Sequence, residues 1–132
     1  MGRFGLKHFL FAFGLFFAAS SGAQAQPAGV FGALALAPDG AYGYSYNYRN
    51  IDEAQDNALD SCRKHGKGCQ IIRVFENVCV TLAGSLDGNN FVANWVSGYN
   101  ASERPERATR ACRNDGGKGC KVLAEFCTGS GR

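Results

Sequence analysis

Cysteine offers the most chemistry in this chain of 132 residues, and its spacing repeats. The segment C-R-K-H-G-K-G-C runs from Cys62 to Cys69, and C-R-N-D-G-G-K-G-C runs from Cys112 to Cys120. Cysteines at close spacing can bind a metal, exchange disulfides or form structural bridges. Structural zinc sites typically place about two to four residues between cysteines, and redox pairs use C-x-x-C, whereas both segments here have longer intervals. We therefore expect structural disulfides, with no metal site and no cofactor.

The cysteines number six, and an even count in a small exported chain is typical of a disulfide framework. Symmetry between the two segments favours one local pair within each of them. Cys79 and Cys127 then remain, and a bond between them would tie the two copies together. The expected pairs are Cys62–Cys69, Cys112–Cys120 and Cys79–Cys127, although six cysteines allow many other pairings.

Side chains for acid–base or nucleophilic catalysis are sparse after residue 25. His65 is the only histidine there, and it lies at the expected exposed end of a helix, where it complements the helix dipole. Glu76 and Glu125 lie near predicted strands, and a small carboxylate-dependent hydrolase would need two such acids in one cleft. We assign no catalytic residue, and a secreted hydrolase of this kind is the alternative hypothesis.

Tyrosine alternates with small residues in the segment Y-G-Y-S-Y-N-Y, from Tyr42 to Tyr48. Side chains alternate in direction along a strand, so the pattern predicts that these tyrosines share one face. Inward placement would cover the helices with aromatic area, and the small polar opposite face favours it because such a face suits solvent. Outward placement would make Tyr44, Tyr46 and Tyr48 a strip that stacks sugars or anchors a protein, with Trp95 in the matching strand of the second copy. These four residues are the candidate binding site.

The elements that would position these residues occur in the same order in both copies. The first copy is expected to contain a strand at 30–37, a strand at 41–48, a helix at 51–64 and a strand at 69–75. The second is expected to contain a strand at 78–84, a strand at 90–98, a helix that ends at Gly116-Gly117 and a strand at 120–126. Asn50 and Ser102 are the expected N-caps of the two helices.

Each copy is thus a β-β-α-β unit, and the fold class is expected to be α+β. We expect the duplicated unit to form one antiparallel-rich sheet with the two helices packed on one face, stapled by disulfides. Residues 26–132 would form a single domain of two repeats, at about 30–77 and 78–127.

Residues 1–25 have the pattern of a secretory signal peptide. Arg3 and Lys7 precede an apolar stretch, which is shorter than a bilayer-spanning helix, and A-Q-A at 23–25 supplies a cleavage site. Much of the small positive charge of the chain lies in this segment, so no attraction to nucleic acid is indicated. The mature protein is expected to be exported, either periplasmic or secreted, with no membrane association after cleavage.

Several of these features occur together in a known bacterial family. They are A-L-A at 33–35 before a turn, G-Y-S-Y-N-Y at 43–48, D-E-A at a helix start, and two segments of the form C-R-x-x-G-(G)-K-G-C. In this combination the chain resembles the secreted family catalogued as domain of unknown function 4189, over nearly all of 30–127. The resemblance implies an exported, disulfide-containing domain of tandem repeats, and it carries over no catalytic residues.

A rigid repeat with aromatic strips and no catalytic set favours a non-catalytic interaction module. Its partner would be an unknown protein or glycan of the cell envelope or the extracellular space.

Overall fold

The computed structural model describes residues 29–130, and the signal peptide predicted at 1–25 lies outside these residues. The elements follow the order expected for a duplicated unit. The first copy contains β1 (Phe31–Leu36), β2 (Tyr42–Tyr48), α1 (Ile51–Arg63) and β3 (Gln70–Glu76). The second copy contains β4 (Cys79–Asp87), β5 (Asn90–Ser97), α2 (Arg104–Asn114) and β6 (Lys121–Cys127). The α+β class and the duplicated β-β-α-β unit are confirmed.

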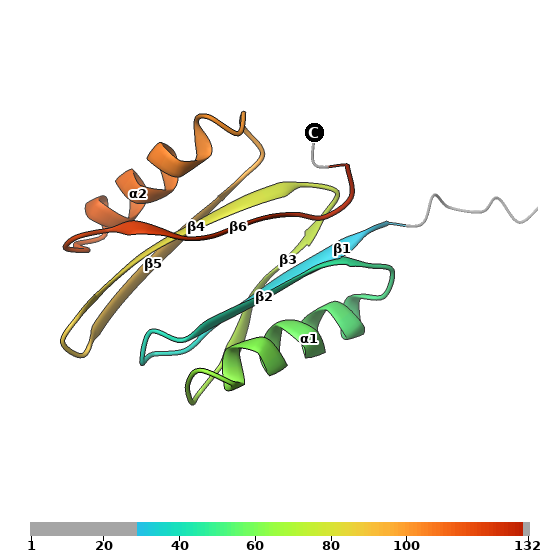
Figure 1. The fold of residues 1–132 in the computed structure, drawn as a ribbon, viewed down its shortest axis with the longest axis horizontal. Helices are drawn as coiled ribbons and strands as arrows, with labels where there is room; N and C mark the ends of the chain where they lie inside the picture. Colours follow the sequence, from blue (N-terminus) through green and yellow to red (C-terminus); the bar gives the residue numbers. More distant parts are fainter. Residues whose placement is uncertain (1–28, 131–132) are drawn as a thin grey trace, which may run out of the picture.

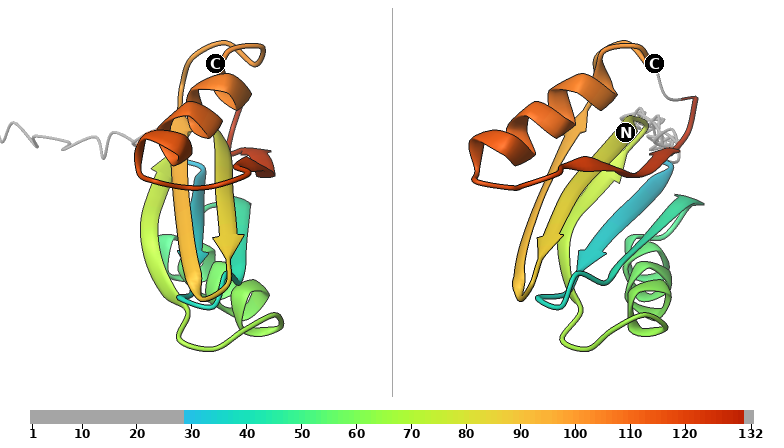
Figure 2. Two further views of the ribbon diagram at one scale, coloured as in Figure 1. Left: turned by 90° about the vertical axis from the view of Figure 1, so that its left-hand side faces the viewer. Right: turned by 60° about the vertical axis from the view of Figure 1, so that its left-hand side comes forward.

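The strands form two antiparallel sheets, whereas the sequence suggested one sheet with both helices on one face. The strand orders are β2-β1-β3 and β5-β4-β6, so the first strand of each copy lies at the centre of its own sheet. The two sheets share a core, with α1 on the outer side of the first sheet and α2 on the outer side of the second (Figure 1). Figure 2 shows the same arrangement from two further directions.

Alternation along the central strands explains this correction. In β1, Ala33 and Ala35 pack under α1, whereas Leu34 belongs to the core between the sheets. In β4, Ala83 packs under α2, whereas Leu82 belongs to the core between the sheets. Because each central strand has buried side chains on both faces, each sheet is covered on both sides. A helix covers one side, and the other sheet covers the opposite side.

Small residues let α1 approach the first sheet closely. A Cβ atom on Gly43 of β2 would collide with backbone atoms of Ala58 and Cys62 in α1. In the second copy, valines of β5, Val92 and Val96, pack on the core under α2. Contact between α1 and the edge strand β2 therefore depends on a glycine that the second copy does not need.

The two helices differ in their caps. Asn50 caps α1 as expected, because its side chain accepts hydrogen bonds from two amides of the first turn. The N-cap of α2 is Glu103, which makes no side-chain cap, and not Ser102 as expected. The Asn100 carbonyl accepts hydrogen bonds from the amides of Glu103 and Arg104, so the preceding turn supplies a partner in place of a capping side chain.

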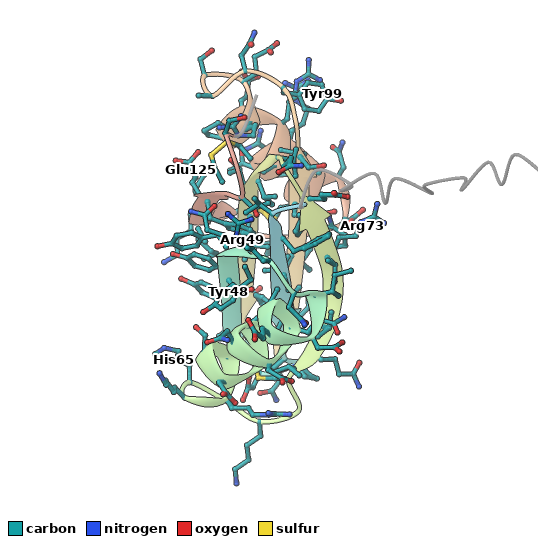
Figure 3. The ribbon with its side chains drawn as sticks, turned by 90° about the vertical axis from the view of Figure 1, so that its right-hand side faces the viewer. Tyr48, Arg49, His65, Arg73, Tyr99 and Glu125 are labelled. Carbon is teal, nitrogen blue, oxygen red and sulfur yellow. A yellow bond between two sulfur atoms is a disulfide. The ribbon has the colours of Figure 1, made fainter. Side chains whose placement is uncertain are left out.

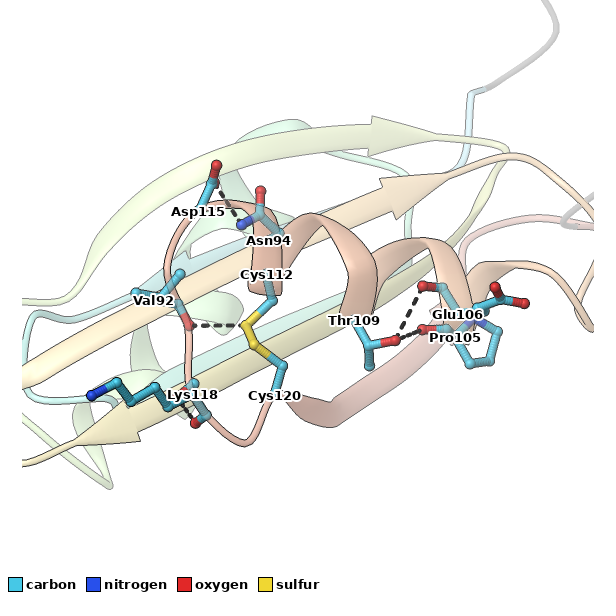
Figure 4. The surroundings of a disulfide bond; sticks show 10 residues. Val92, Asn94, Pro105, Glu106, Thr109, Cys112, Asp115, Lys118 and Cys120 are labelled. Carbon is cyan, nitrogen blue, oxygen red and sulfur yellow. Dashed lines mark hydrogen bonds between the residues drawn. A yellow bond between two sulfur atoms is a disulfide. The ribbon is translucent and has the colours of Figure 1, made fainter.

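The disulfides join Cys62 to Cys69, Cys112 to Cys120 and Cys79 to Cys127, which are the pairs that symmetry predicts. The two local bonds each join a helix end to the residue before the next strand, as Figure 4 shows for the second copy. The third bond joins directly paired residues of β4 and β6. It lies within the second sheet, so the expectation that it ties the two copies together is wrong.

Non-covalent contacts hold the two copies together instead. The core between the sheets contains Phe75 from the first copy and Leu82 and Phe126 from the second. The Tyr42 hydroxyl donates a hydrogen bond of 3.0 Å to the Leu123 carbonyl across this boundary. The tyrosine strand thus contributes directly to the joint between the copies.

Candidate functional site

The tyrosine strand β2 lies at an edge of the first sheet, and its tyrosines do not share one face. Tyr42 and Tyr44 pack on the core between the sheets, Tyr46 is 51% exposed, and Tyr48 packs on the core under α1. The alternation breaks at Asn47, whose φ of 63° lies in the left-handed region. The pairing of β2 with β1 also shifts register near this end of the strand, so that Tyr48 turns to the helix side.

The face of β2 that the sequence suggested was open to solvent is covered by α1. Ser45 on this face is only 4% exposed. Its hydroxyl donates a hydrogen bond of 2.5 Å to the Ala54 carbonyl in α1 and accepts one of 3.1 Å from the Ala33 amide in β1. The buried hydroxyl therefore joins the edge strand, the central strand and the helix.

Four aromatic rings form a column that runs from the core to the surface. Tyr46 stacks on Tyr44 at 6.3 Å between ring centroids, and Tyr44 stacks on Phe126 at 4.8 Å. Phe126 in turn meets Phe75 edge to face at 5.9 Å. Both phenylalanines are buried, whereas Tyr46 is exposed. The column thus connects an exposed tyrosine ring to the core through stacked neighbours.

A groove of about 690 Å³ lies between the outer edge of β2 and α1, and we call it the β2–α1 groove. Its lining residues are Tyr44, Ser45, Tyr46, Tyr48, Asn57, Asp60, Ser61 and Lys64. A hollow of about 540 Å³ continues past Tyr44 and Ser61 towards the turn between β1 and β2, and Asp39, His65 and Leu86 contribute to it. Figure 3 shows Tyr48 and His65 on the same side of the molecule.

The acidic groups along this surface already have partners. Asp60 forms an exposed ion pair of 3.5 Å with Arg63. Asp39 accepts hydrogen bonds from the amides of Lys67 at 3.0 Å and Ala41 at 3.1 Å. These hydrogen bonds, that from Lys67 first, lower the pKa of the Asp39 carboxyl because they stabilise its charged form.

The side chains of two basic residues have no such partners. The side chains of Lys64 and His65 form no hydrogen bond or ion pair with other residues in 29–130. Both follow the last turn of α1, and Lys64 is its C-cap residue. The groove therefore offers an uncommitted positive charge on its helix side.

The structure brings only part of the predicted site together. Tyr44, Tyr46 and Tyr48 all line the β2–α1 groove, whereas Trp95 lies in the second sheet, half-buried against the core between the sheets. The sequence prediction missed the helix side of the groove, which includes Asn57, Ser61 and Lys64. Their spacing of four and three residues places them on one helix face, and this is the signal that could have found them.

The two candidate carboxylates of the hydrolase hypothesis lie in different sheets. Glu76 is the last residue of β3 and pairs with Phe31. Glu125 belongs to β6, and its carboxylate accepts a hydrogen bond of 3.1 Å from the Thr81 hydroxyl. Glu125 lines a hollow beside Tyr46, to which Glu76 does not contribute.

The second copy has a smaller counterpart of the groove, of about 230 Å³, beside α2. Tyr99 and Arg107 line it, with the guanidinium 4.0 Å from the centre of the tyrosine ring. Tyr99 is 57% exposed, close to the value for Tyr46. The two copies thus present one exposed tyrosine each, but only the first places it at the rim of a wide groove.

Neither a metal cluster nor a membrane span occurs in the described part of the chain. No group of three or more His, Cys, Asp or Glu residues within 29–130 could hold a metal ion. No helix in the same range is long and apolar enough to cross a membrane.

Comparison with known proteins identifies one matching family. Neither the curated proteins nor the solved structures contain a match to the chain. A family model described as a domain of unknown function, DUF4189, matches residues 31–127. This range begins at the first residue of β1 and ends at the last residue of β6, so it contains both β-β-α-β units. The chain therefore belongs to the DUF4189 family.

Proposed function

We propose that this protein is an exported binding module that acts without catalysis and holds its partner in the β2–α1 groove. The partner is a protein or glycan of the cell envelope or the extracellular space. The observation that carries the proposal is Tyr46, an exposed ring at the rim of the groove, supported from beneath by Tyr44 and Phe126.

The geometry favours binding because the aromatic surface is ordered in advance. Tyrosine is enriched in the parts of interfaces that contribute most to affinity, where it offers a large apolar ring and a polar hydroxyl. An exposed ring that is already stacked loses little further freedom when a partner covers it. Polar side chains of α1, Asn57 and Ser61 among them, stand opposite the ring and could fix the orientation of a ligand.

Export is supported by two independent features. The sequence has the pattern of a secretory signal at 1–25. The structure has three disulfides, which are typical of proteins in oxidising compartments. A periplasmic or secreted location fits both features.

No contact among residues 29–130 favours the hydrolase alternative. It requires two acids in one cleft, and its candidates, Glu76 and Glu125, belong to different sheets. Glu125 is also engaged by the Thr81 hydroxyl.

The proposal is tested by capture of partners on oxidised protein of residues 26–132. Extracts of the envelope and of the culture medium would be passed over the native bait, a Tyr46→Ala bait and a Tyr99→Ala bait. Tyr99 is the matched control, since it is exposed to a similar extent but lies away from the groove. We expect a partner that the native and Tyr99→Ala baits retain and the Tyr46→Ala bait loses. Retention of the same molecules by all three baits would contradict the proposed site.

A further inference from the structure

We infer that the β2–α1 groove takes an extended acidic peptide segment of the partner, which adds to the edge of β2 as a fourth strand of the first sheet. This inference rests on the proposed function and narrows it, because it specifies the class of partner and the way in which it binds.

The groove reaches the backbone edge of β2. Its lining includes the consecutive residues Tyr44, Ser45 and Tyr46. Successive side chains of a strand point to opposite faces of the sheet, so a hollow on one face would touch only alternate residues. A hollow that touches three in succession must run along the edge, where the outward N–H and C=O groups of an edge strand lie. The hollow that continues it also touches three consecutive residues of β2, from Tyr42 to Tyr44.

From Tyr42 to Tyr46 the edge of β2 lacks the protection that edge strands usually have. At Asn47 the strand becomes irregular, and the Asn47 amide donates a hydrogen bond of 3.4 Å to the Thr128 hydroxyl. Natural edges are blunted by charged side chains, proline, β-bulges or short length, because an open edge pairs readily with another chain. β2 has seven residues without charge or proline, whereas the opposite edge strand β3 contains Arg73 and Glu76. The five residues of this regular stretch span roughly 17 Å at roughly 3.3 Å each, which is enough to pair with a short extended peptide.

The second sheet provides an internal comparison. Its corresponding edge strand, β5, is also uncharged, but the hollow beside it is about a third as large. Tyr99 and Arg107 contribute to that smaller hollow and contact one another there. Only the first copy therefore combines an unprotected strand edge with room for another strand beside a helix, an arrangement that binds extended peptides by strand addition.

Charge determines the kind of peptide. Asp60 and Asp39 along the groove are already engaged, by Arg63 and by backbone amides respectively. Lys64 is the charged group of the groove without a partner in residues 29–130. A carboxylate in the peptide would complement it, so an acidic segment fits better than a basic one.

The experiment selects binders for the oxidised protein from a random peptide library, with peptides of about ten residues, which are longer than β2 and can cover the whole strand. Selected peptides are synthesised, and their affinities are measured by fluorescence anisotropy. We expect acidic peptides, with binding weakened at least about tenfold by Lys64→Glu, which repels them. Lys121→Glu in β6 is the matched control and should leave affinity unchanged.

Backbone pairing is tested with N-methylated peptides. Methylation of the peptide amides that face β2 removes several ladder hydrogen bonds and should weaken binding on the order of a hundredfold. Methylation of the intervening amides should have little effect. If both sets bind alike, or if the selected peptides are basic or indifferent to Lys64→Glu, strand addition by an acidic segment is wrong.

The remaining outcomes separate this inference from the function on which it rests. If no peptide is selected but an oligosaccharide from the extracts binds and is lost with Tyr46→Ala, the partner is a glycan and only the inference fails. If sedimentation instead shows a dimer that Tyr46→Ala dissociates, the occupant is a second copy and the inference again fails. If no ligand of any class depends on Tyr46, both the inference and the proposed function fail.

Discussion

Replacement of Ser45 by alanine tests whether α1 lies against the edge strand as described. The Ser45 hydroxyl makes two buried hydrogen bonds, to the Ala54 carbonyl and from the Ala33 amide. Without it, the Ala33 amide loses its acceptor inside the protein, and loss of one partner of a buried hydrogen bond typically costs about 1–3 kcal/mol. We therefore expect Ser45→Ala to lower the free energy of unfolding by about 2 kcal/mol. For a domain of this size, the midpoint of thermal unfolding should fall by about 8–16 °C.

The assay is thermal and urea unfolding of oxidised protein, followed by circular dichroism. Ser97→Ala is the matched control, because Ser97 is an exposed serine at the end of β5. Its substitution should change the free energy of unfolding by less than about 0.5 kcal/mol. If Ser45→Ala proves as stable as Ser97→Ala, then Ser45 is not buried under α1, and the helix side of the groove is misplaced.

Three further substitutions give distinct results. Gly43→Ala should destabilise the protein by about 3 kcal/mol in urea unfolding, since the added methyl group meets the backbone of α1; a neutral effect would show that α1 does not touch β2 there. Replacement of both Cys79 and Cys127 by alanine opens a bond with a sequence separation of 48 and should reduce stability by about 4 kcal/mol in the same assay, whereas a loss below about 1 kcal/mol would contradict the chain-entropy estimate. Asp39→Asn should destabilise the protein at neutral pH. The pKa of Asp39 is lowered in the folded protein, which means that its ionised carboxylate stabilises the folded state. The difference in the free energy of unfolding between the native protein and Asp39→Asn should shrink as the pH falls below about 3.8 and through the pKa of Asp39 in the folded state. A difference that stays the same from neutral to strongly acidic pH would refute this role of Asp39.

Local features of this fold could be predicted because single residues determine them. The repeated cysteine segments and the Asn50 cap indicate where each helix begins or ends, and the returning strand follows each local disulfide. The symmetry of these segments also led to the pairs that the structure contains. Such features depend on contacts between residues close in sequence, so one copy of the repeat serves as a template for the other.

The layering could not be predicted in the same way because it depends on what covers each face. Ala33 and Leu34 are both apolar, yet one packs under α1 and the other against the second sheet. The sequence pattern places small residues such as Gly43 and Ser45 on a solvent-facing side, whereas their size is what allows the helix to approach. Composition alone does not distinguish a small residue that faces water from one that faces a close backbone.

The candidate site is also only partly predictable from the sequence. Alternation in β2 predicts four tyrosines on one face and favours inward placement, whereas Tyr46 is exposed. The change of face at Tyr48 follows from the backbone of Asn47, a single residue with positive φ. The groove itself joins a strand to a helix face that includes Asn57 and Lys64. Its existence depends on how closely the helix and the strand approach, and no single segment of the sequence contains that information.

The claim that the β2–α1 groove holds the partner is tested most directly by filling the groove. Asn57→Trp places a large side chain on its exposed helix wall and leaves every tyrosine of β2 unchanged, and Asn114→Trp does the same beside α2 as the matched control. The measurement is quantitative capture of envelope and medium components on the native and the two tryptophan baits. We expect Asn57→Trp to lose the same partner as Tyr46→Ala, while Asn114→Trp retains it. Full retention of the partner by a folded Asn57→Trp protein would contradict the assignment of the groove as the binding site.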